Sequence, residues 1–243
     1  MTSISANLQA VKSRIVAACT AAGRDPGEVT LLAVSKTWPA GAVRQAAAGG
    51  QRAFGENYVQ EAVAKAAALA DLGLEWHFIG PLQSNKTRPV AETFAWVHSV
   101  DRLKLAERLA AQRPAGLAPL QVCVQVNVSG EESKSGCTAD AAPDLCRAVA
   151  ALPNLRLRGL MAIPEPAQES GLAVRRFGEL RALRDRLNAA GMQLDTLSMG
   201  MSDDLEDAIM AGATIVRVGT AIFGERAQTC ISHSSAAATW PWP

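Results

Sequence analysis

A single lysine, Lys36, ends the apolar run TLLAVSK and stands three residues before Pro39, which can start a helix. An ammonium group costs free energy wherever water is partly excluded, so a lysine in this place either extends to solvent or is used. Partial desolvation and nearby cations lower the pKa of a lysine and expose a nucleophilic amine. Lys36 is therefore the first candidate for chemistry, as the amine that forms a Schiff base with a carbonyl compound.

Two segments near the end of the chain carry groups that suit a phosphate. The segment SMGMSDDLEDAI offers the hydroxyls of Ser198 and Ser202 and backbone N–H groups at a predicted helix start. The segment VGTAIFG offers Gly219, where a backbone can approach an anion closely, and the hydroxyl and amide of Thr220. A lysine facing these groups suits a phosphorylated carbonyl compound. Both phosphosugars and pyridoxal 5′-phosphate (PLP) meet that description.

Arg217 lies two residues before the glycine of the second segment, on the same face of its run as Ile215. A guanidinium among apolar residues needs a partner, because an unpaired buried charge is costly. Its partner is either an acceptor on a ligand or an inward carboxylate such as that of Glu56. The first alternative adds a second cation to the site of Lys36.

These residues stand at the ends of short β-rich runs that alternate with helical stretches rich in Ala, Leu and Arg. Alternating βα units imply a parallel sheet, and eight of them in one chain of 243 residues favour a closed (β/α)8 barrel of the TIM type. No G-x-G-x-x-G follows the first run, so an open doubly wound sheet lacks its expected sign. In such barrels the carboxyl ends of the strands form the working face, and the loops after strands seven and eight often bind phosphate. The predicted strands cover residues 30–36, 52–56, 75–80, 95–100, 120–128, 155–163, 194–199 and 213–224.

An extra helix is predicted ahead of the barrel, with Ser5 as its N-cap and Gly23 at its end. Its apolar residues recur at helical spacing: Leu8, Val11, Ile15 and Ala18. Asp101 is predicted to cap the helix in DRLKLAERLAAQR. Further helices are predicted near residues 39–48, 84–92, 138–151 and 169–190. We expect one barrel domain over residues 1–226 and a disordered tail over residues 227–243.

Composition argues against several classes of protein. The formal net charge is +1, from 24 basic and 23 acidic residues, and no basic block stands out, so nucleic-acid binding has little support. Five cysteines without C-x-x-C spacing and three histidines far apart in the sequence argue against a metal site or a disulfide framework. This pattern fits a reducing, cytoplasmic compartment. No apolar stretch approaches the roughly 18 residues of a membrane helix. The charged helical faces lead us to expect a monomer.

Six blocks of the chain resemble the pyridoxal phosphate homeostasis protein family, which is itself similar to the barrel domain of alanine racemase. The blocks are AVSKT, FGENYVQE, EWHFIGPLQSNK, GLMAIP, LSMGMSDDLEDAI and VRVGTAIFG, and they extend from about residue 5 to residue 226. The resemblance implies that PLP forms an internal aldimine with Lys36 and that Arg217 faces the pyridine nitrogen. It also implies that Asn57 is a neighbour of the pyridine ring. The implied phosphate contacts are Ser198, Ser202, Gly219 and Thr220, and the helix start favours Ser202 as the principal serine.

An arginine opposite the pyridine nitrogen donates a hydrogen bond without giving up a proton, because its pKa is above about 12. The ring is then a weaker electron sink than the pyridinium of transaminases. With no clear second base, we assign no catalytic residue and expect a protein that carries or buffers PLP for apoenzymes and keeps vitamin B6 in balance, rather than an enzyme. The runner-up is a PLP-dependent amino-acid racemase with Tyr58, His77 or Lys134 as the second base. The third is a class I aldolase in which Lys36 attacks a sugar phosphate.

Overall fold

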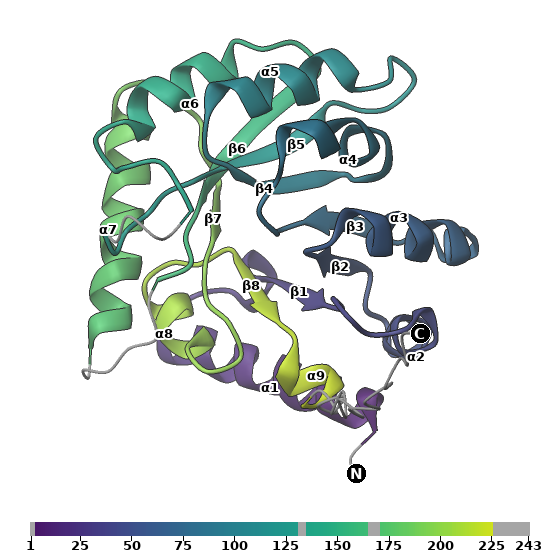
Figure 1. Cartoon of the computed structure of the whole chain (residues 1–243). Helices are drawn as coiled ribbons and strands as arrows, with labels where there is room; N and C mark the ends of the chain where they lie inside the picture. The colour runs from purple at the N-terminus through teal and green to yellow at the C-terminus, as the bar shows by residue number, and fades with distance from the viewer. Residues whose placement is uncertain (1–2, 131–134, 165–170, 226–243) are drawn as a thin grey trace, which may run out of the picture.

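The structure, a computed structural model, describes residues 3–130, 135–164 and 171–225. Eight parallel strands form a closed barrel in which each strand pairs with the next and the eighth pairs with the first (Figure 1). The strands are β1 (Thr30–Val34), β2 (Ala53–Glu56), β3 (Glu75–Phe78), β4 (Trp96–Val100), β5 (Leu120–Gln125), β6 (Leu155–Met161), β7 (Thr196–Ser198) and β8 (Ile215–Val218). The predicted (β/α)8 barrel and its eight strands are confirmed. The strands end up to six residues earlier than predicted. Ser198 and Arg217 lie within β7 and β8, whereas the other predicted site residues lie just beyond the ends of their strands.

Helices surround the barrel and cover its outer face (Figure 1). The described helices are α1 (Ile4–Ala21), α2 (Ala40–Ala48), α3 (Val59–Ala68), α4 (Thr87–Thr93), α5 (Leu103–Gln112), α6 (Ala142–Ala150), α7 (Leu172–Ala189), α8 (Leu205–Met210) and α9 (Thr220–Phe223). Short 3-10 turns lie at Pro26–Glu28, Ala70–Leu72 and Ser84–Lys86. The extra helix α1 packs against α2, α8 and α9, so it covers the seam where β8 meets β1.

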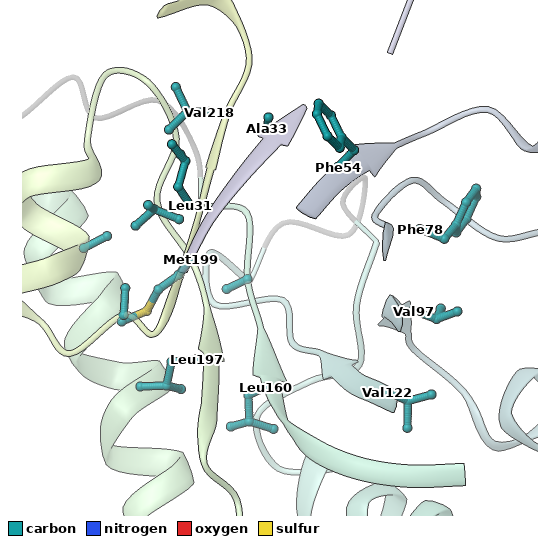
Figure 2. Packing of buried hydrophobic residues seen from close by; sticks show 14 of the residues in the cluster. Leu31, Ala33, Phe54, Phe78, Val97, Val122, Leu160, Leu197, Met199 and Val218 are labelled. Atoms are coloured by element: carbon teal, nitrogen blue, oxygen red, sulfur yellow. The ribbon is translucent and has the colours of Figure 1, made fainter. Parts of the chain in front are cut away.

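Alternation along the strands separates an outer core from an inner one. In β1, Leu31 and Ala33 pack with the helices, whereas Leu32 and Val34 belong to the small apolar cluster inside the barrel. Figure 2 shows outward-facing residues of the larger cluster, such as Phe54 and Phe78, around the ring of strands. Full burial of one large apolar side chain contributes about 1.5–3 kcal/mol. This period of two is what directs alternate side chains of β8, including Arg217, into the barrel.

Two predicted helix caps were wrong. Helix α1 is capped by Ser3, whose Oγ accepts from the amide of Ala6 at 3.2 Å, because the helix begins at Ile4 and Ser5 already lies in its first turn. Gly23 has a φ of +65°, and the predicted end of that helix is confirmed. Helix α5 begins after Arg102 without a side-chain cap. Asp101 fails as a cap because its carboxylate accepts from the Arg102 guanidinium at 2.7 Å.

The cysteines of the described segments carry free thiols: Cys19, Cys123, Cys137 and Cys146. Burial raises the pKa of Cys137 to about 11 and that of Cys146 to about 12, so both thiols stay protonated and unreactive at neutral pH. Within the described segments, no group of three or more His, Cys, Asp or Glu side chains is placed to hold a metal ion. The helices searched in these segments include none long and apolar enough to cross a membrane. The expected tail at residues 227–243 and Lys134 lie outside the described residues.

Candidate functional site

A pocket of about 240 Å³ opens at the carboxyl ends of the strands, beside the turn that follows β1. Six of the seven site residues predicted from the sequence line it: Lys36, Asn57, Ser202, Arg217, Gly219 and Thr220. They come from the ends of β1, β2 and β8 and from the loop after β7, which are far apart in the sequence. The seventh, Ser198, is fully buried at the end of β7 and does not line the pocket.

The turn that presents Lys36 is strained. Strand β1 ends at Val34, and the amide of Ser35 donates to the carbonyl of Gly55 at 3.0 Å. The next residue after Lys36, Thr37, has a φ of +68°, which is rare and costly for a β-branched residue. Its amide donates to the carboxylate of Glu61 on α3 at 2.5 Å, which holds the turn in this conformation. The neighbouring helix therefore fixes the direction in which the backbone presents Lys36.

A buried ion-pair cluster supports the same turn from behind. Lys65 on α3 donates to the carbonyl of Ser35 at 2.6 Å and pairs with Glu56 at 2.7 Å and with Glu61 at 2.6 Å. Burial raises the pKa of the Glu56 carboxyl, although hydrogen bonds from Lys65 and Ser35 oppose the shift. The suggested salt bridge between Glu56 and Arg217 was therefore wrong, because the side chain of Glu56 faces Lys65 and the Ser35 hydroxyl instead.

Arg217 points into the barrel and reaches the floor of the pocket. Its Nη1 donates to the hydroxyl of Ser198 and its Nη2 to the carbonyl of Ala162, each at 2.9 Å. Among the described residues, no carboxylate lies within ion-pair distance of it. Burial lowers the pKa of the Arg217 guanidinium to about 10, so it carries its charge at neutral pH. The pocket thus contains a buried cation whose two hydrogen-bond acceptors in the described part of the chain are both neutral.

The loops after β7 and β8 lie side by side at the mouth of the pocket, since the hydroxyl of Ser202 accepts from the amide of Ala221 at 3.4 Å. Gly200 has a φ of +91°, and a Cβ there would come within 2.5 Å of the Cβ of Ala208, so the loop requires glycine. The cap residue of α8 is Asp204, and Ser202 lies two residues before it. The prediction that Ser202 lies at the helix start was therefore wrong. Ser202 does not cap α8, and it contributes its hydroxyl group to the pocket.

The residues considered as a second base are elsewhere. His77 is buried inside the barrel, with its ring nitrogens bonded to His98 and Glu75, and it does not line the pocket. Tyr58 follows β2, is 54% exposed and is also absent from the lining.

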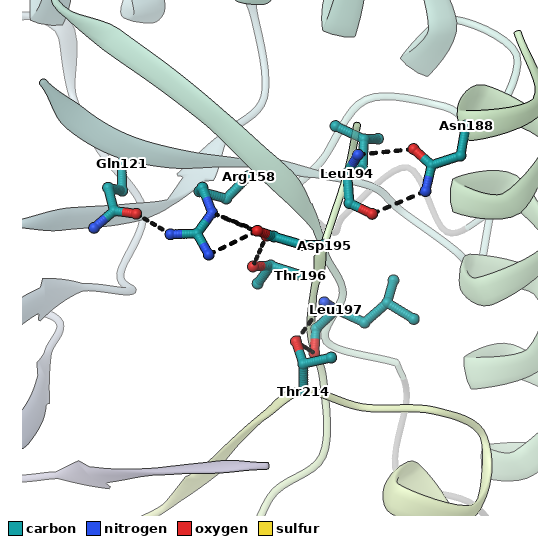
Figure 3. A network of polar contacts seen from close by, with 8 residues as sticks. All are labelled: Gln121, Arg158, Asn188, Leu194, Asp195, Thr196, Leu197 and Thr214. Carbon is teal, nitrogen blue, oxygen red and sulfur yellow. Dashed lines mark hydrogen bonds and ion pairs between the residues drawn. The ribbon is translucent and has the colours of Figure 1, made fainter. Parts of the chain in front are cut away.

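A second and larger cavity, of about 710 Å³, lies at the opposite end of the barrel, among the first residues of β1, β4, β7 and β8. Figure 3 shows the network beside it, in which Arg158 bridges Gln121 and Asp195. The guanidinium also lies 4.9 Å from the centre of the Trp96 ring. Thr196 donates to Asp195 at 2.8 Å. The polar groups in this network satisfy one another.

The chain is similar to known proteins over most of its length. The family described as "Alanine racemase, N-terminal domain" matches residues 6–227. The pyridoxal phosphate homeostasis protein of Pseudomonas aeruginosa is 65% identical over 226 residues, which cover 93% of this chain and 97% of the relative. That of Escherichia coli K12 is 56% identical over 234 residues, which cover 93% of this chain and 98% of the relative.

The chain belongs to the pyridoxal phosphate homeostasis protein family.

A solved structure in the comparison is that of PipY from Synechococcus elongatus with PLP bound. PipY is 39% identical to this chain and superposes on it with a TM-score of 0.80. The superposition covers 91% of this chain and 100% of PipY. The family match over residues 6–227 includes all seven predicted site residues.

Sequence reasoning missed Lys65 and the contact of His77 with His98 in this member of the pyridoxal phosphate homeostasis protein family. Lys65 sits in an alanine-rich helix, and only its spacing of four from Glu61 indicated a pair. His98 and His77 are 21 residues apart, yet they meet because β3 and β4 are adjacent in the barrel. The alternation of β3 and β4 could have placed both rings inside the barrel, but not their contact with each other.

Proposed function

We propose that this protein binds PLP in the pocket at the carboxyl ends of the strands and carries or buffers it as a pyridoxal phosphate homeostasis protein. The main support is that a lysine amine, a buried guanidinium and two hydroxyls line one pocket. The names of the two relatives and the PLP in the PipY structure support the same ligand. The buried Oδ1 of Asn57 has no hydrogen-bond partner among the described residues, which suits a pocket that accepts a polar ligand.

When bound, PLP supplies an aldehyde that condenses with a primary amine and releases water. We assign this amine to Lys36, whose turn is held by Glu61 and by the buried Lys65 behind it. Arg217 would face the pyridine nitrogen as a hydrogen-bond donor and would keep its own proton, because its pKa of about 10 is far above that of a pyridine. The chain therefore binds the ring without turning it into a strong electron sink.

The phosphate contacts are assigned to Ser202, Thr220 and the backbone at Gly219. Ser202 is preferred to Ser198 because it lines the pocket, whereas the Ser198 hydroxyl lies between Arg217 and His98. A Cβ at Gly219 would lie only 3.2 Å from the carbonyl oxygen of Val34, so glycine lets the backbone of this loop pack against the end of β1 at the edge of the pocket. Asn57 is the proposed neighbour of the ring.

A carrier is favoured over a racemase because racemisation requires a second base across the substrate. Neither Tyr58 nor His77 lines the pocket. The same proposal includes PLP-requiring apoenzymes as recipients, a monomeric state, one barrel domain over residues 1–226 and a separate tail over residues 227–243. The free thiols of the described cysteines support a cytoplasmic location.

The test is a set of binding titrations of the cofactor-free protein with three ligands. PLP carries both the aldehyde and the phosphate, pyridoxal lacks the phosphate, and pyridoxine 5′-phosphate lacks the aldehyde. We expect PLP to bind at least about tenfold more tightly than either of the others, since each lacks one of the two anchors. Equal affinity for PLP and pyridoxal would remove the phosphate assignment. Failure to bind PLP, with capture of a phosphosugar ketone by borohydride, would favour the aldolase.

A further inference from the structure

A chain of hydrogen bonds runs through the inside of the barrel, from the floor of the pocket to the opposite end. Arg217 Nη1 is 2.9 Å from Ser198 Oγ, and that oxygen is 2.7 Å from His98 Nδ1. His98 Nε2 is 2.9 Å from His77 Nδ1, and His77 Nε2 is 2.8 Å from a carboxylate oxygen of Glu75. Strands β8, β7, β4 and β3 thus each contribute to one continuous path.

The direction of this path is fixed at both ends. A guanidinium can only donate, and an ionised carboxylate can only accept. Ser198 therefore accepts from Arg217 and donates to Nδ1 of His98, whose Nε2–H donates to His77. His77 in turn uses its Nε2–H to donate to Glu75. Every donor meets an acceptor only when both rings are neutral and carry their proton on Nε2.

The surroundings of the two rings favour the neutral form. His77 and His98 are 1% and 0% exposed, and burial lowers the pKa of both, that of His98 well below its ordinary value. The charge of Arg217 disfavours a second cation at His98. Trp96 stacks on His77 with ring centres 5.3 Å apart and an angle of 6° between the rings, which limits rotation of that ring. Hydrogen bonding from His77 lowers the pKa of the Glu75 carboxyl, so the far end of the path is anionic at neutral pH.

The path also answers how the charge of Arg217 is tolerated. A buried charge without a paired counter-charge is strongly unfavourable. The charge of Asp204 favours the charged form of Arg217 and raises its pKa, but among the described residues no carboxylate lies within ion-pair distance of the guanidinium. Hydrogen bonds in series polarise one another in a medium of low dielectric constant, so a carboxylate at one end stabilises a cation at the other. Glu75 is half-exposed at the opposite end of the barrel, where water reduces the cost of its charge.

We propose that Ser198, His98, His77 and Glu75 are positioning residues that hold the Arg217 guanidinium in place for a ligand in the pocket, with Glu75 as its remote counter-charge. This inference rests on the proposed function, in which Arg217 contacts the pyridine ring of PLP. The path does not deliver a proton to the ligand, because Arg217 retains its proton. It orients a donor and fixes the ring tautomers.

The first arm of the test does not need the ligand. Nitrogen-15 NMR of the histidine rings at pH 6–8 should show Nε2 protonated and Nδ1 unprotonated on both His77 and His98. In Glu75→Gln the amide can donate as well as accept, so the direction is no longer imposed and a second tautomer should appear. The matched control is Glu92→Gln, an exposed carboxylate on α4, which should leave both rings unchanged. Doubly protonated rings, or the opposite tautomers in the unmodified protein, would overturn the proposal.

The second arm is a double-mutant cycle read as PLP affinity. His98→Leu should weaken PLP binding about fivefold in the unmodified background and less than about twofold when Arg217 is already replaced by leucine. Equal loss in both backgrounds would mean that His98 acts through general stability and would overturn the positioning role. If His98→Leu does not fold, Glu75→Gln replaces it in the same cycle. If PLP does not bind at all, the proposed function fails, while the NMR arm still decides on the path itself.

Discussion

The two ends of the barrel differ in how their cations are balanced. The amino-end cavity is larger, about 710 Å³ against about 240 Å³, and four arginines line it. Each of them pairs with a carboxylate of the chain, and two of them share Asp185: Arg24–Glu28, Arg158–Asp195, Arg181–Asp185 and Arg184–Asp185. At the carboxyl end, the described residues give Arg217 only a hydroxyl and a carbonyl.

Cavity size therefore does not identify the end of the barrel that binds a ligand. The amino-end groups are bonded to one another, so binding a ligand there would first require breaking ion pairs. The smaller pocket keeps a cation that forms no ion pair with any described residue, together with a lysine on a strained turn. Barrels generally place function at the carboxyl ends of strands and stability at the amino ends. The comparison can be tested by removing matched groups from each end.

The largest expected effect is a loss of PLP affinity when the hydroxyl groups of the pocket are removed. Replacing Ser202 and Thr220 together by alanine should weaken PLP binding by about 10–100-fold, because two hydrogen bonds to a charged phosphate are lost. The temperature of unfolding should change little, since Thr220 is exposed and Ser202 is partly exposed. The measurement is a PLP titration alongside thermal unfolding.

The matched control is Thr214→Ala, which removes a hydroxyl from the amino-end cavity. Thr214 Oγ1 accepts from the amide of Leu197 at 2.9 Å, so its loss should lower stability and leave PLP affinity unchanged. If the double variant bound PLP as tightly as the control, the phosphate assignment would be wrong.

A smaller effect, on stability rather than on PLP affinity, is expected from Arg158→Ala. The variant loses the paired bonds to Asp195 and the contact with the Trp96 ring, and should be about 1–2 kcal/mol less stable at pH 7 by urea unfolding. PLP affinity should remain within about twofold. A tenfold loss of affinity would show that the amino end takes part in binding through the ion pair.

The same variant gives a pH dependence of known sign. Burial alone would raise the pKa of Asp195, but hydrogen bonds from Arg158 and Thr196 and the charge of Arg158 lower it overall. A lowered carboxyl pKa contributes stability above the unfolded value near 4, and this contribution is lost as the pH falls through the folded value. The stability difference between Arg158→Ala and the unmodified protein should therefore shrink below about pH 4.

The sequence predicted the barrel and the face of the site because both depend on local patterns. Strand runs, helical spacing and the order of βα units can be read directly from the sequence. Lys36 and Thr220 could therefore be assigned to the same end of the barrel, where both line the pocket. The predictions that failed concern contacts between segments that are distant in the sequence. The partner of Glu56 is Lys65 on a helix, and Ser198 turns inward to meet His98, a residue 100 positions away. Caps were misjudged where a shift of one or two residues decides the cap, as at Asp101 and Ser5.

The most direct test of the central claim is borohydride reduction of the protein with PLP, followed by peptide mass mapping. Reduction converts the bond between an amine and the aldehyde into a stable secondary amine, which marks the lysine that formed it. Lys65 is the built-in competitor, because it lies just behind the same turn with its ammonium held by Glu56 and Glu61. We expect the pyridoxyl adduct on Lys36, and none in Lys36→Ala. An adduct on Lys65, or an equal yield of adduct in Lys36→Ala, would contradict the account.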